Sequence, residues 1–129
     1  MKSFSDFLNE EHTSMAGIEG EVYELNGAWI DIHLKPTYAP RSQSVIEFFV
    51  PETTRGQGIG TKLLRMAMHD HNDIGAQVSS LASLKVFYNC GFRNPELVEG
   101  TFNDHVGEFK ENGGSLFMAM CDENGKRYL

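Results

Sequence analysis

The sequence from Ser44 to Asp70, SVIEFFVPETTRGQGIGTKLLRMAMHD, contains the pattern on which the prediction of the fold depends. Its first seven residues are rich in β-branched and aromatic types, which favour a buried strand. Pro51 has no amide hydrogen to donate to a strand ladder, so the strand should end there. Apolar residues then recur at helical spacing from Ile59 to Met68. The stretch therefore predicts a strand, a glycine-rich turn and a helix.

Three glycines, Gly56, Gly58 and Gly60, stand within five residues at this turn. The first amide groups of a helix have no partner inside the helix, and the helix dipole adds partial positive charge there. Glycines let a bulky anion approach the backbone, and Arg55 would add a charge-assisted donor. The turn is therefore predicted to bind phosphate groups. A glycine-rich turn that binds nothing is the alternative.

Two common phosphate-binding motifs do not fit this turn. The nucleoside-triphosphate loop needs Lys followed by Ser or Thr after its last glycine, whereas Thr61 here precedes Lys62. The dinucleotide fingerprint needs a glycine three residues after its second one, and that position is Thr61.

The segment from Arg55 to Gly60, RGQGIG, resembles the pyrophosphate-binding loop of the GNAT acetyltransferases. That loop has the pattern Arg or Gln, two residues, Gly, one residue, Gly or Ala. Pro51-Glu52 before the turn and Leu63-Leu64 after it are also similar to this family. The resemblance implies an α+β fold with a mixed, mostly antiparallel central sheet, two main helices and a shortened N-terminal part.

The resemblance also implies acetyl-coenzyme A as co-substrate, bound along the end of the strand and the turn. A main-chain amide near Phe49 or Val50 would polarise the thioester carbonyl, and separation of this strand from the next would open a slot for pantetheine. The residues that would contact the co-substrate are Phe48, Phe49, Val50, Arg55, Gly56, Gln57, Gly58, Ile59, Gly60 and Thr61, with Ser80 beside the pantetheine arm.

Residues 83–92, SLKVFYNCGF, resemble the second signature of the family, a helix that ends in Gly-Phe. The family tyrosine lies four residues before the glycine, where this chain has Phe87. Tyr88 follows one step later, rotated by about 100° around the helix. Either Tyr88 protonates the coenzyme A thiolate from a shifted helix, or water or nothing does so. Tyr88 as an ordinary amphipathic core residue is the alternative.

Glu47 is the single carboxylate in an apolar strand, where a charge is costly unless it is paired or useful. The resemblance implies a general base on this strand, and a partly buried carboxylate suits the deprotonation of an ammonium group. Alternatively, alternation puts Glu47 on a solvent-facing side with Phe49, or it pairs with Arg41.

The bulk composition is that of one soluble domain, residues 21–129, after a lead-in of residues 1–20. The chain has 129 residues and a net charge of −7, with 18 acidic against 11 basic residues, which argues against a nucleic-acid partner. No apolar run approaches the ~18–20 residues of a membrane span. The two cysteines, Cys90 and Cys121, make no disulfide framework, so a cytoplasmic setting is expected. His69 and His71, two residues apart, do not face one way on a helix, so no metal site is expected.

The remaining elements follow from turn and capping signals. Asn26-Gly27 predicts a type I′ hairpin between strands 21–25 and 28–34, which would lead into the strand from Ser44. A second helix is predicted from Ser80 to Cys90. A final strand pair, Leu97–Phe102 and Ser115–Cys121, is expected around a loop from residue 103 to residue 114.

The first ten residues are similar to the short capsid-targeting leaders on internal head proteins of large tailed bacteriophages. Such leaders are removed after Leu or Ile, any residue and Glu, and Leu8-Asn9-Glu10 fits. The chain would then be packaged in a phage head. An ordinary N-terminal helix on the domain is the alternative.

Taken together, these features predict an N-acetyltransferase in which a primary amine, on a small molecule or a protein lysine, attacks the thioester of acetyl-coenzyme A directly. Only about twenty residues precede Glu21, so the acceptor pocket is expected to be reduced, or completed by a second subunit in a homodimer or by a protein substrate. Neither nucleic acid nor a membrane is an expected partner. The alternative is a catalytically inactive module that keeps the fold and serves in coenzyme A binding, structure or interaction.

Overall fold

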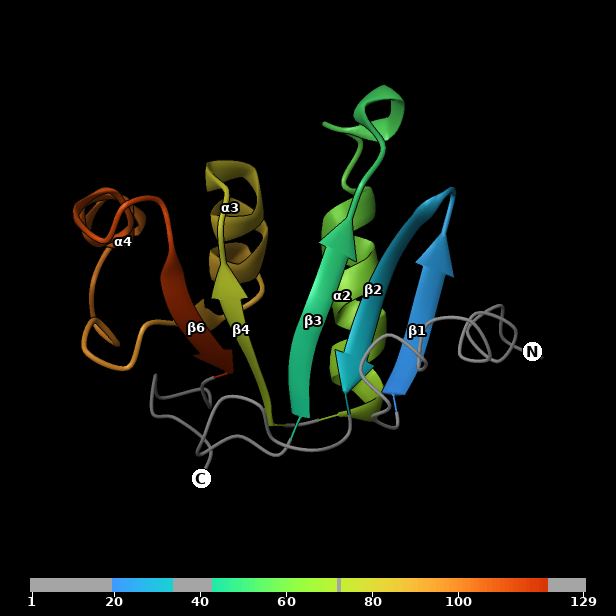
Figure 1. Cartoon of the computed structure of the whole chain (residues 1–129), viewed down its shortest axis with the longest axis horizontal. Helices are drawn as coiled ribbons and strands as arrows, with labels where there is room; N and C mark the ends of the chain where they lie inside the picture. The colour runs from blue at the N-terminus through green and yellow to red at the C-terminus, as the bar shows by residue number, and fades with distance from the viewer. Residues whose placement is uncertain (1–19, 34–42, 72, 121–129) are drawn as a thin grey trace.

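The computed structural model describes residues 20–33, 43–71 and 73–120. Within these residues, six strands form one sheet in the order β1-β2-β3-β4-β6-β5, with helices packed against it (Figure 1). The elements are β1 (Gly20–Leu25), β2 (Ala28–His33), β3 (Gln43–Phe49), the 3₁₀ turn η2 (Glu52–Thr54), α2 (Ile59–Asp70), β4 (Ile74–Val78), α3 (Leu81–Asn89), β5 (Phe92–Arg93), α4 (Phe102–Glu111) and β6 (Leu116–Met120).

The first three strands form the predicted antiparallel meander. Asn26 and Gly27 at the first turn both have positive φ, 51° and 83°, as a type I′ turn requires. The hairpin prediction is therefore confirmed, and so is the strand that precedes the glycine-rich turn.

The sheet changes direction between β3 and β4, which run parallel. Their pairing covers only residues 43–45 of β3 and residues 74–76 of β4. Beyond it the two strands diverge toward their carboxyl ends (Figure 1). The separation that the resemblance implies is present, and it lies beside the glycine-rich turn after β3.

Helices α2 and α3 lie on the same side of the sheet (Figure 1). One face of α2 is buried, as its helical spacing predicts. The apolar side chains of this layer that are fully buried, with no exposed surface, include Ile30, Ile32, Leu63, Leu64, Ala67 and Leu84. At about 1.5–3 kcal/mol for each buried aliphatic side chain, this layer holds the helices against the sheet.

The prediction for residues 97–114 is wrong. Residues 97–101 form turns instead of a strand, and helix α4 occupies most of the expected loop, so the described chain has three α-helices where two main ones were expected. Thr101 accepts a hydrogen bond from the Asp104 amide, and the Asp104 side chain accepts one from the Thr101 amide. This capping box, with His105 and Phe109 one turn apart and buried, stabilises a helix. The strand partners of β6 are instead β4 and β5.

Several predictions fall outside the described residues. They concern the lead-in with Leu8-Asn9-Glu10, the end of the second strand at Leu34, the loop with Arg41, and Cys121. Among the described helices, none has the length and apolar character needed to cross a bilayer.

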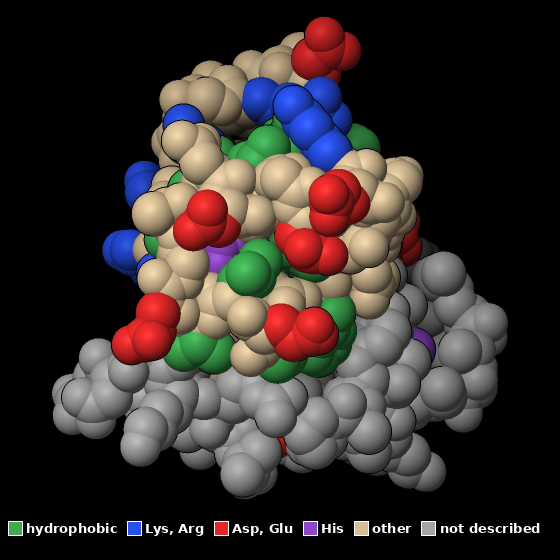
Figure 2. All heavy atoms as spheres, turned by 90° about the vertical axis from the view of Figure 1, so that its left-hand side faces the viewer, with side chains coloured by type: hydrophobic (Ala, Val, Ile, Leu, Met, Phe, Trp, Pro, Cys, Tyr) green, Lys and Arg blue, Asp and Glu red, His purple; other side chains and the backbone are tan. Residues whose placement is uncertain are grey.

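Charge is distributed unevenly on the side of the molecule that carries α4. Figure 2 shows acidic side chains scattered over this side, with basic side chains confined to its edges. The described residues on this side therefore form no continuous basic surface.

Substituting Thr101 by Ala removes one half of the α4 capping box. We expect the free energy of unfolding to fall by about 1 kcal/mol, because an amide of the first turn loses its acceptor. Chemical denaturation measures this, with Thr53→Ala as the control, because η2 has no side-chain cap. Equal losses in the two variants would contradict a stabilising role of the cap.

Candidate functional site

The turn between η2 and α2 depends on two glycines in the left-handed region. Gly56 has φ 84°, and Gly58, the N-cap of α2, has φ 76°. Side chains other than glycine are strained in this conformation. A Cβ atom at either position would meet no atom within 4 Å. The backbone of the turn therefore faces open space.

The amide groups at this end of α2 have no helical acceptors. The first bond within the helix is donated by the Lys62 amide to the Gly58 carbonyl, at 3.1 Å. The amides of Ile59, Gly60 and Thr61 precede it and, as at every helix start, have no acceptor within the helix. Together with the helix dipole, they make this end of α2 attractive to an anion.

Arg55 and Gln57 brace the turn. Arg55 donates from Nε to the Val50 carbonyl at 3.1 Å, and Gln57 donates from Nε2 to the Thr53 carbonyl at 3.5 Å. Both side chains are exposed. Because Arg55 uses Nε, its terminal guanidinium nitrogens stay at the surface of the turn, where they can pair with an anion.

Gly60 has a different role, since it lets α2 approach the sheet closely. A Cβ atom there would lie 3.2 Å from Cζ of Phe48, 3.4 Å from Cγ2 of Val50 and 3.5 Å from Cγ2 of Val86. Ile59 beside it is buried, with 5% of its surface exposed. Of the predicted contact residues, Phe48, Ile59 and Gly60 thus make packing contacts, whereas Arg55 to Gly58 face outward.

The side chains of β3 alternate between the two faces of the sheet. Phe48 points to the helices and packs edge-on against Phe87, with ring centroids 5.6 Å apart. In the strand register, Glu47 lies opposite Asp31 of β2 and Phe49 lies opposite Trp29. These four residues therefore share the opposite face of the sheet. Glu47 is half-buried there, and Phe49 is 40% exposed. Glu47 and Phe49 thus share a face of the sheet, on which Glu47 is only partly exposed, and the catalytic role of Glu47 stays a prediction.

Tyr88 lies away from the separation between β3 and β4. Its hydroxyl donates to the Gly100 carbonyl at 3.1 Å, and its ring packs edge-on against Phe102 and His105 of α4. The guanidinium of Arg93 lies 3.6 Å from the ring centroid. Phe87, rather than Tyr88, is the residue of α3 that packs against β3. The role of Tyr88 as an acid stays a prediction, and these contacts favour its alternative, a structural residue.

Ser80 is the N-cap of α3, so the helix begins one residue after the predicted start. Its Oγ accepts a hydrogen bond from the Ser83 amide at 3.1 Å and donates to Ser83 Oγ at 2.9 Å. Ser80 is exposed, at the carboxyl end of β4. It therefore lies across the strand separation from the end of β3.

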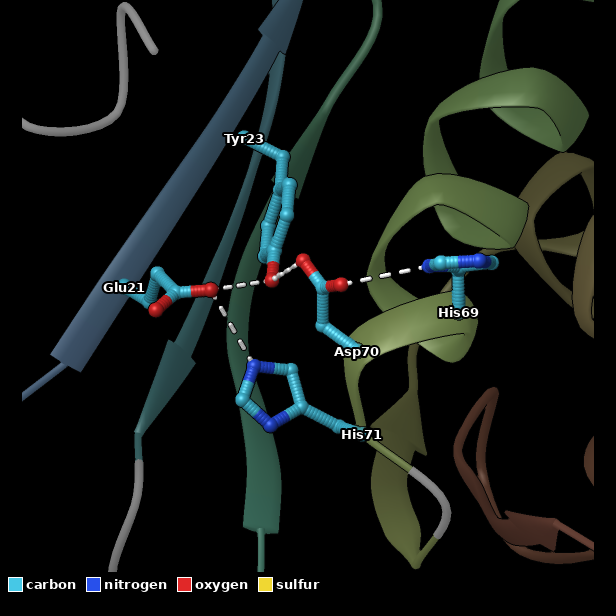
Figure 3. A network of polar contacts seen from close by, with 5 residues as sticks. All are labelled: Glu21, Tyr23, His69, Asp70 and His71. Atoms are coloured by element: carbon cyan, nitrogen blue, oxygen red, sulfur yellow. Dashed lines mark hydrogen bonds and ion pairs between the residues drawn. The ribbon is translucent and has the colours of Figure 1, made fainter. Parts of the chain in front are cut away.

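A polar network that the sequence did not predict joins the far end of α2 to β1 (Figure 3). The Tyr23 hydroxyl lies between Glu21 Oε1 and Asp70 Oδ2 and bonds to both, the second at 2.7 Å. His71 Nε2 lies 3.2 Å from the same Glu21 oxygen. The only sequence signal is the i, i+2 spacing of Glu21 and Tyr23, which puts both on one face of a strand.

This network shifts the ionisation of two of its members. Burial, followed by the hydrogen bonds to Glu21 and Asp70, raises the pKa of Tyr23 far above its ordinary value. The hydrogen bond from Tyr23, followed by that from His69, holds the pKa of the Asp70 carboxyl below its usual value. An open depression of about 490 Å³ lies alongside, lined by Tyr23, Lys62, Arg65, Met66, His69 and Asp70.

The other reactive residues of the described chain form no second centre. His69 bonds to Asp70 and His71 to Glu21, so the two rings point apart (Figure 3). Among residues 20–33, 43–71 and 73–120, no group of three or more His, Cys, Asp or Glu side chains is arranged to hold a metal ion. Cys90 is half-buried, and burial, partly opposed by Arg65, raises the pKa of its thiol, which does not favour a nucleophile.

Comparison with solved structures finds a protein of similar fold. A solved structure described as an IAA acetyltransferase from Bacillus cereus ATCC 14579 superposes with a TM-score of 0.55 at 22% sequence identity, over 84% of this chain and 83% of that chain. The chain is thus similar in fold to an acetyltransferase, in line with the sheet and helices expected from the sequence. No protein-family model and no curated protein sequence matches the chain.

The raised pKa of Tyr23 predicts a fall in stability at alkaline pH. The unfolded chain ionises this phenol near pH 10. The folded chain keeps the phenol protonated. The stabilisation that Tyr23 contributes to the folded state is therefore complete below about pH 10 and is lost as the pH rises beyond that value. Tyr23 should therefore stay protonated in the folded protein at a pH at which the unfolded chain has already ionised it.

Absorbance at the tyrosinate wavelength measures this difference, with Tyr23→Phe as the control. Folded wild type and folded Tyr23→Phe should titrate alike, whereas the two unfolded chains should differ by one tyrosine. A folded wild type that releases one more proton than the variant would show that Tyr23 is not protected.

Proposed function

We propose that this chain is an N-acyltransferase that moves the acetyl group of acetyl-coenzyme A to a primary amine. The observation that carries the proposal is the outward-facing glycine turn at the start of α2, beside the point where β3 and β4 separate. A ligand site at the carboxyl ends of diverging parallel strands is common in α/β proteins. The similarity in fold to an acetyltransferase and the resemblance of residues 55–60 to the family loop support it further.

The residues of the turn fit the linked phosphates of coenzyme A. Gly56 and Gly58 leave open space in front of the backbone, and the amides that start α2 lack helical acceptors. Arg55 adds positive charge at the same edge. We assign the pyrophosphate to the backbone of residues 56–61 and to the Arg55 guanidinium, because unpaired amides and a guanidinium are good donors to phosphate oxygens.

The rest of the donor would run along the free end of β3. The pairing of β3 with β4 stops at Val45, so the main-chain groups from Ile46 onward have no partner on β4. An extended pantetheine chain can bond to such an open strand edge. A main-chain amide near Phe49 or Val50 would then polarise the thioester carbonyl as charge develops on its oxygen. Ser80 stands on the opposite side of the same opening.

The transfer needs a base that deprotonates the acceptor, and coenzyme A leaves as a thiolate. We propose that Glu47 accepts a proton from the ammonium form of the acceptor, directly or through water. The free amine then attacks the carbonyl carbon, so that the C–N bond forms and the C–S bond breaks. After the attack the nitrogen loses a further proton to give the amide, and the thiolate takes up a proton to become the thiol of coenzyme A. Holding both reactants together supplies much of the rate enhancement.

An acid for the departing thiolate is a separate question. The Tyr88 hydroxyl bonds to Gly100 and its ring packs on α4, which supports a structural role for this residue. We therefore propose that water or the attacking nitrogen supplies the proton. The other candidate function, an inactive module that binds coenzyme A, is favoured by this same lack of a second catalytic group.

Gly58→Ala tests the turn. A Cβ at φ 76° costs about 1–2 kcal/mol and enters the space assigned to the phosphates, so the affinity for coenzyme A should fall at least about tenfold. Titration calorimetry measures it. Gly107→Ala is the matched control, because Gly107 lies on the exposed side of α4 and a Cβ there meets nothing within 4 Å. Unchanged affinity in Gly58→Ala, or no binding by wild type, would refute the assigned phosphate site.

Glu47→Gln tests the chemistry. We expect kcat/KM for an amine acceptor to fall about a hundredfold near neutral pH, and the loss to shrink at high pH where the amine is already neutral. Release of the coenzyme A thiol measures the rate, and Glu111→Gln, an exposed carboxylate on α4, is the control. Coenzyme A affinity should stay unchanged. Wild type that binds coenzyme A and releases no thiol with any amine would support the inactive module.

Tyr88→Phe in the same assay separates the two roles of this tyrosine. Because the hydroxyl already bonds to Gly100, we expect kcat to stay within about twofold of wild type. A hundredfold loss of kcat at unchanged coenzyme A affinity would instead identify Tyr88 as the acid.

A further inference from the structure

The face of the meander that points away from α2 carries an ordered set of aromatic and acidic residues. Tyr23 and Ile30 pair with each other and face α2, so their strand neighbours point the other way. Cross-strand pairing arranges these neighbours in two rows. The first row is Glu24, Trp29 and Phe49, and the second is Val22, Asp31 and Glu47.

The row at the carboxyl end of β3 is partly exposed to solvent, most of all at Phe49. Phe49 is 40% exposed and stacks on Trp29, with ring centroids 4.9 Å apart and an angle of 37° between the ring planes. Glu24, Trp29 and Glu47 are half-buried, whereas Val22 and Asp31 in the second row are buried. An accessible aromatic pair is therefore flanked by Glu24 on one side and by Glu47 in the next row.

All the charged residues in these two rows are acidic. Their six positions hold three carboxylates and no Lys or Arg. Asp31 and Glu47 lie directly opposite each other, which is unfavourable for like charges. Asp31 also lies 3.9 Å from His33 Nε2. Aromatic ring faces and carboxylates both attract cations, so this surface complements a cationic ligand.

The spacing of the two accessible carboxylates selects among cations. Glu24 is on β1 and Glu47 is on β3, so two interstrand spacings, about 10 Å, separate their strands. A monoamine can pair with one of these groups only. A linear molecule with amino groups several carbon atoms apart can pair with both while its alkyl part crosses Trp29 and Phe49.

We propose that the acceptor is a linear polyamine, held with one ammonium beside Glu47 and a second at Glu24, across the Trp29–Phe49 pair. This inference rests on the proposed function and names its substrate class. Glu24, Trp29 and Phe49 are specificity residues in it, because they bind the part of the acceptor that does not react. The bond changes are those of the transfer described above, with the terminal amine of the polyamine as nucleophile.

Trp29 allows a test that does not need turnover, because it is the single tryptophan of the chain. Spermidine should change the Trp29 fluorescence in a saturable way, and butylamine, a monoamine, should bind at least about tenfold more weakly. The spermidine affinity should fall as salt is raised, since both contacts are ionic.

Two variants with matched controls locate the second contact. Glu24→Gln should weaken spermidine binding about fivefold to tenfold and leave butylamine binding unchanged, with Glu111→Gln as its control. Phe49→Ala should weaken both amines, with Leu81→Ala as its control, because Leu81 is the other large apolar residue that is exposed in the described chain. In the transfer assay, Glu24→Gln should raise KM for spermidine and leave kcat within about twofold.

The outcomes separate this inference from the proposed function. Spermidine that leaves Trp29 unaffected, or that binds no better than butylamine, overturns the polyamine assignment even if coenzyme A binds and other amines are acetylated. Transfer to lysine peptides alone overturns it as well. Spermidine binding at Trp29 without coenzyme A binding would keep the cation site and refute the acyltransferase.

Discussion

The close approach of the first turn of α2 to β3 is the constraint on which the rest of the structure depends. Gly60 has no side chain, so its backbone packs closely against the side chains of Phe48, Val50 and Val86. This contact fixes the amide end of α2 next to the carboxyl end of β3, where β3 has left β4. Without it, the donors for an anion and the open strand edge would be separate features.

The opposite end of α2 adds polar contacts to its apolar packing. Tyr23 of β1 bonds to Asp70, and Glu21 lies next to His71, so the edge strand and the helix end are tied together. A helix held at both ends keeps a defined direction, which suits a preorganised phosphate site. Successive side chains of β3 point to opposite faces of the sheet. Phe48 packs under the helices, while Glu47 and Phe49 face the surface assigned to the acceptor.

Much of this arrangement followed from local features of the sequence. The strand before Pro51, the positive φ values at Asn26 and Gly27, the Ser80 cap and the outward glycine turn each depend on residues close together in the chain. The helix over residues 102–111 was missed although its signals are local too. Its capping box uses Asp104 in place of the usual Glu, and its glycine at position 107 weakens the helical pattern.

The sequence by itself determined the strand, turn and helix that form the candidate phosphate site, because dihedral preference, apolar period and unpaired helix amides are properties of a short stretch of chain. Tertiary structure alone decided which side chains meet across the sheet. Tyr23 donates a hydrogen bond to Asp70, which lies 47 residues away in the chain. Tyr88 packs on α4 instead of on β3. Trp29 and Phe49 stack only because the register of β2 and β3 brings them together. Such pairs depend on how distant segments pack, which no local pattern specifies.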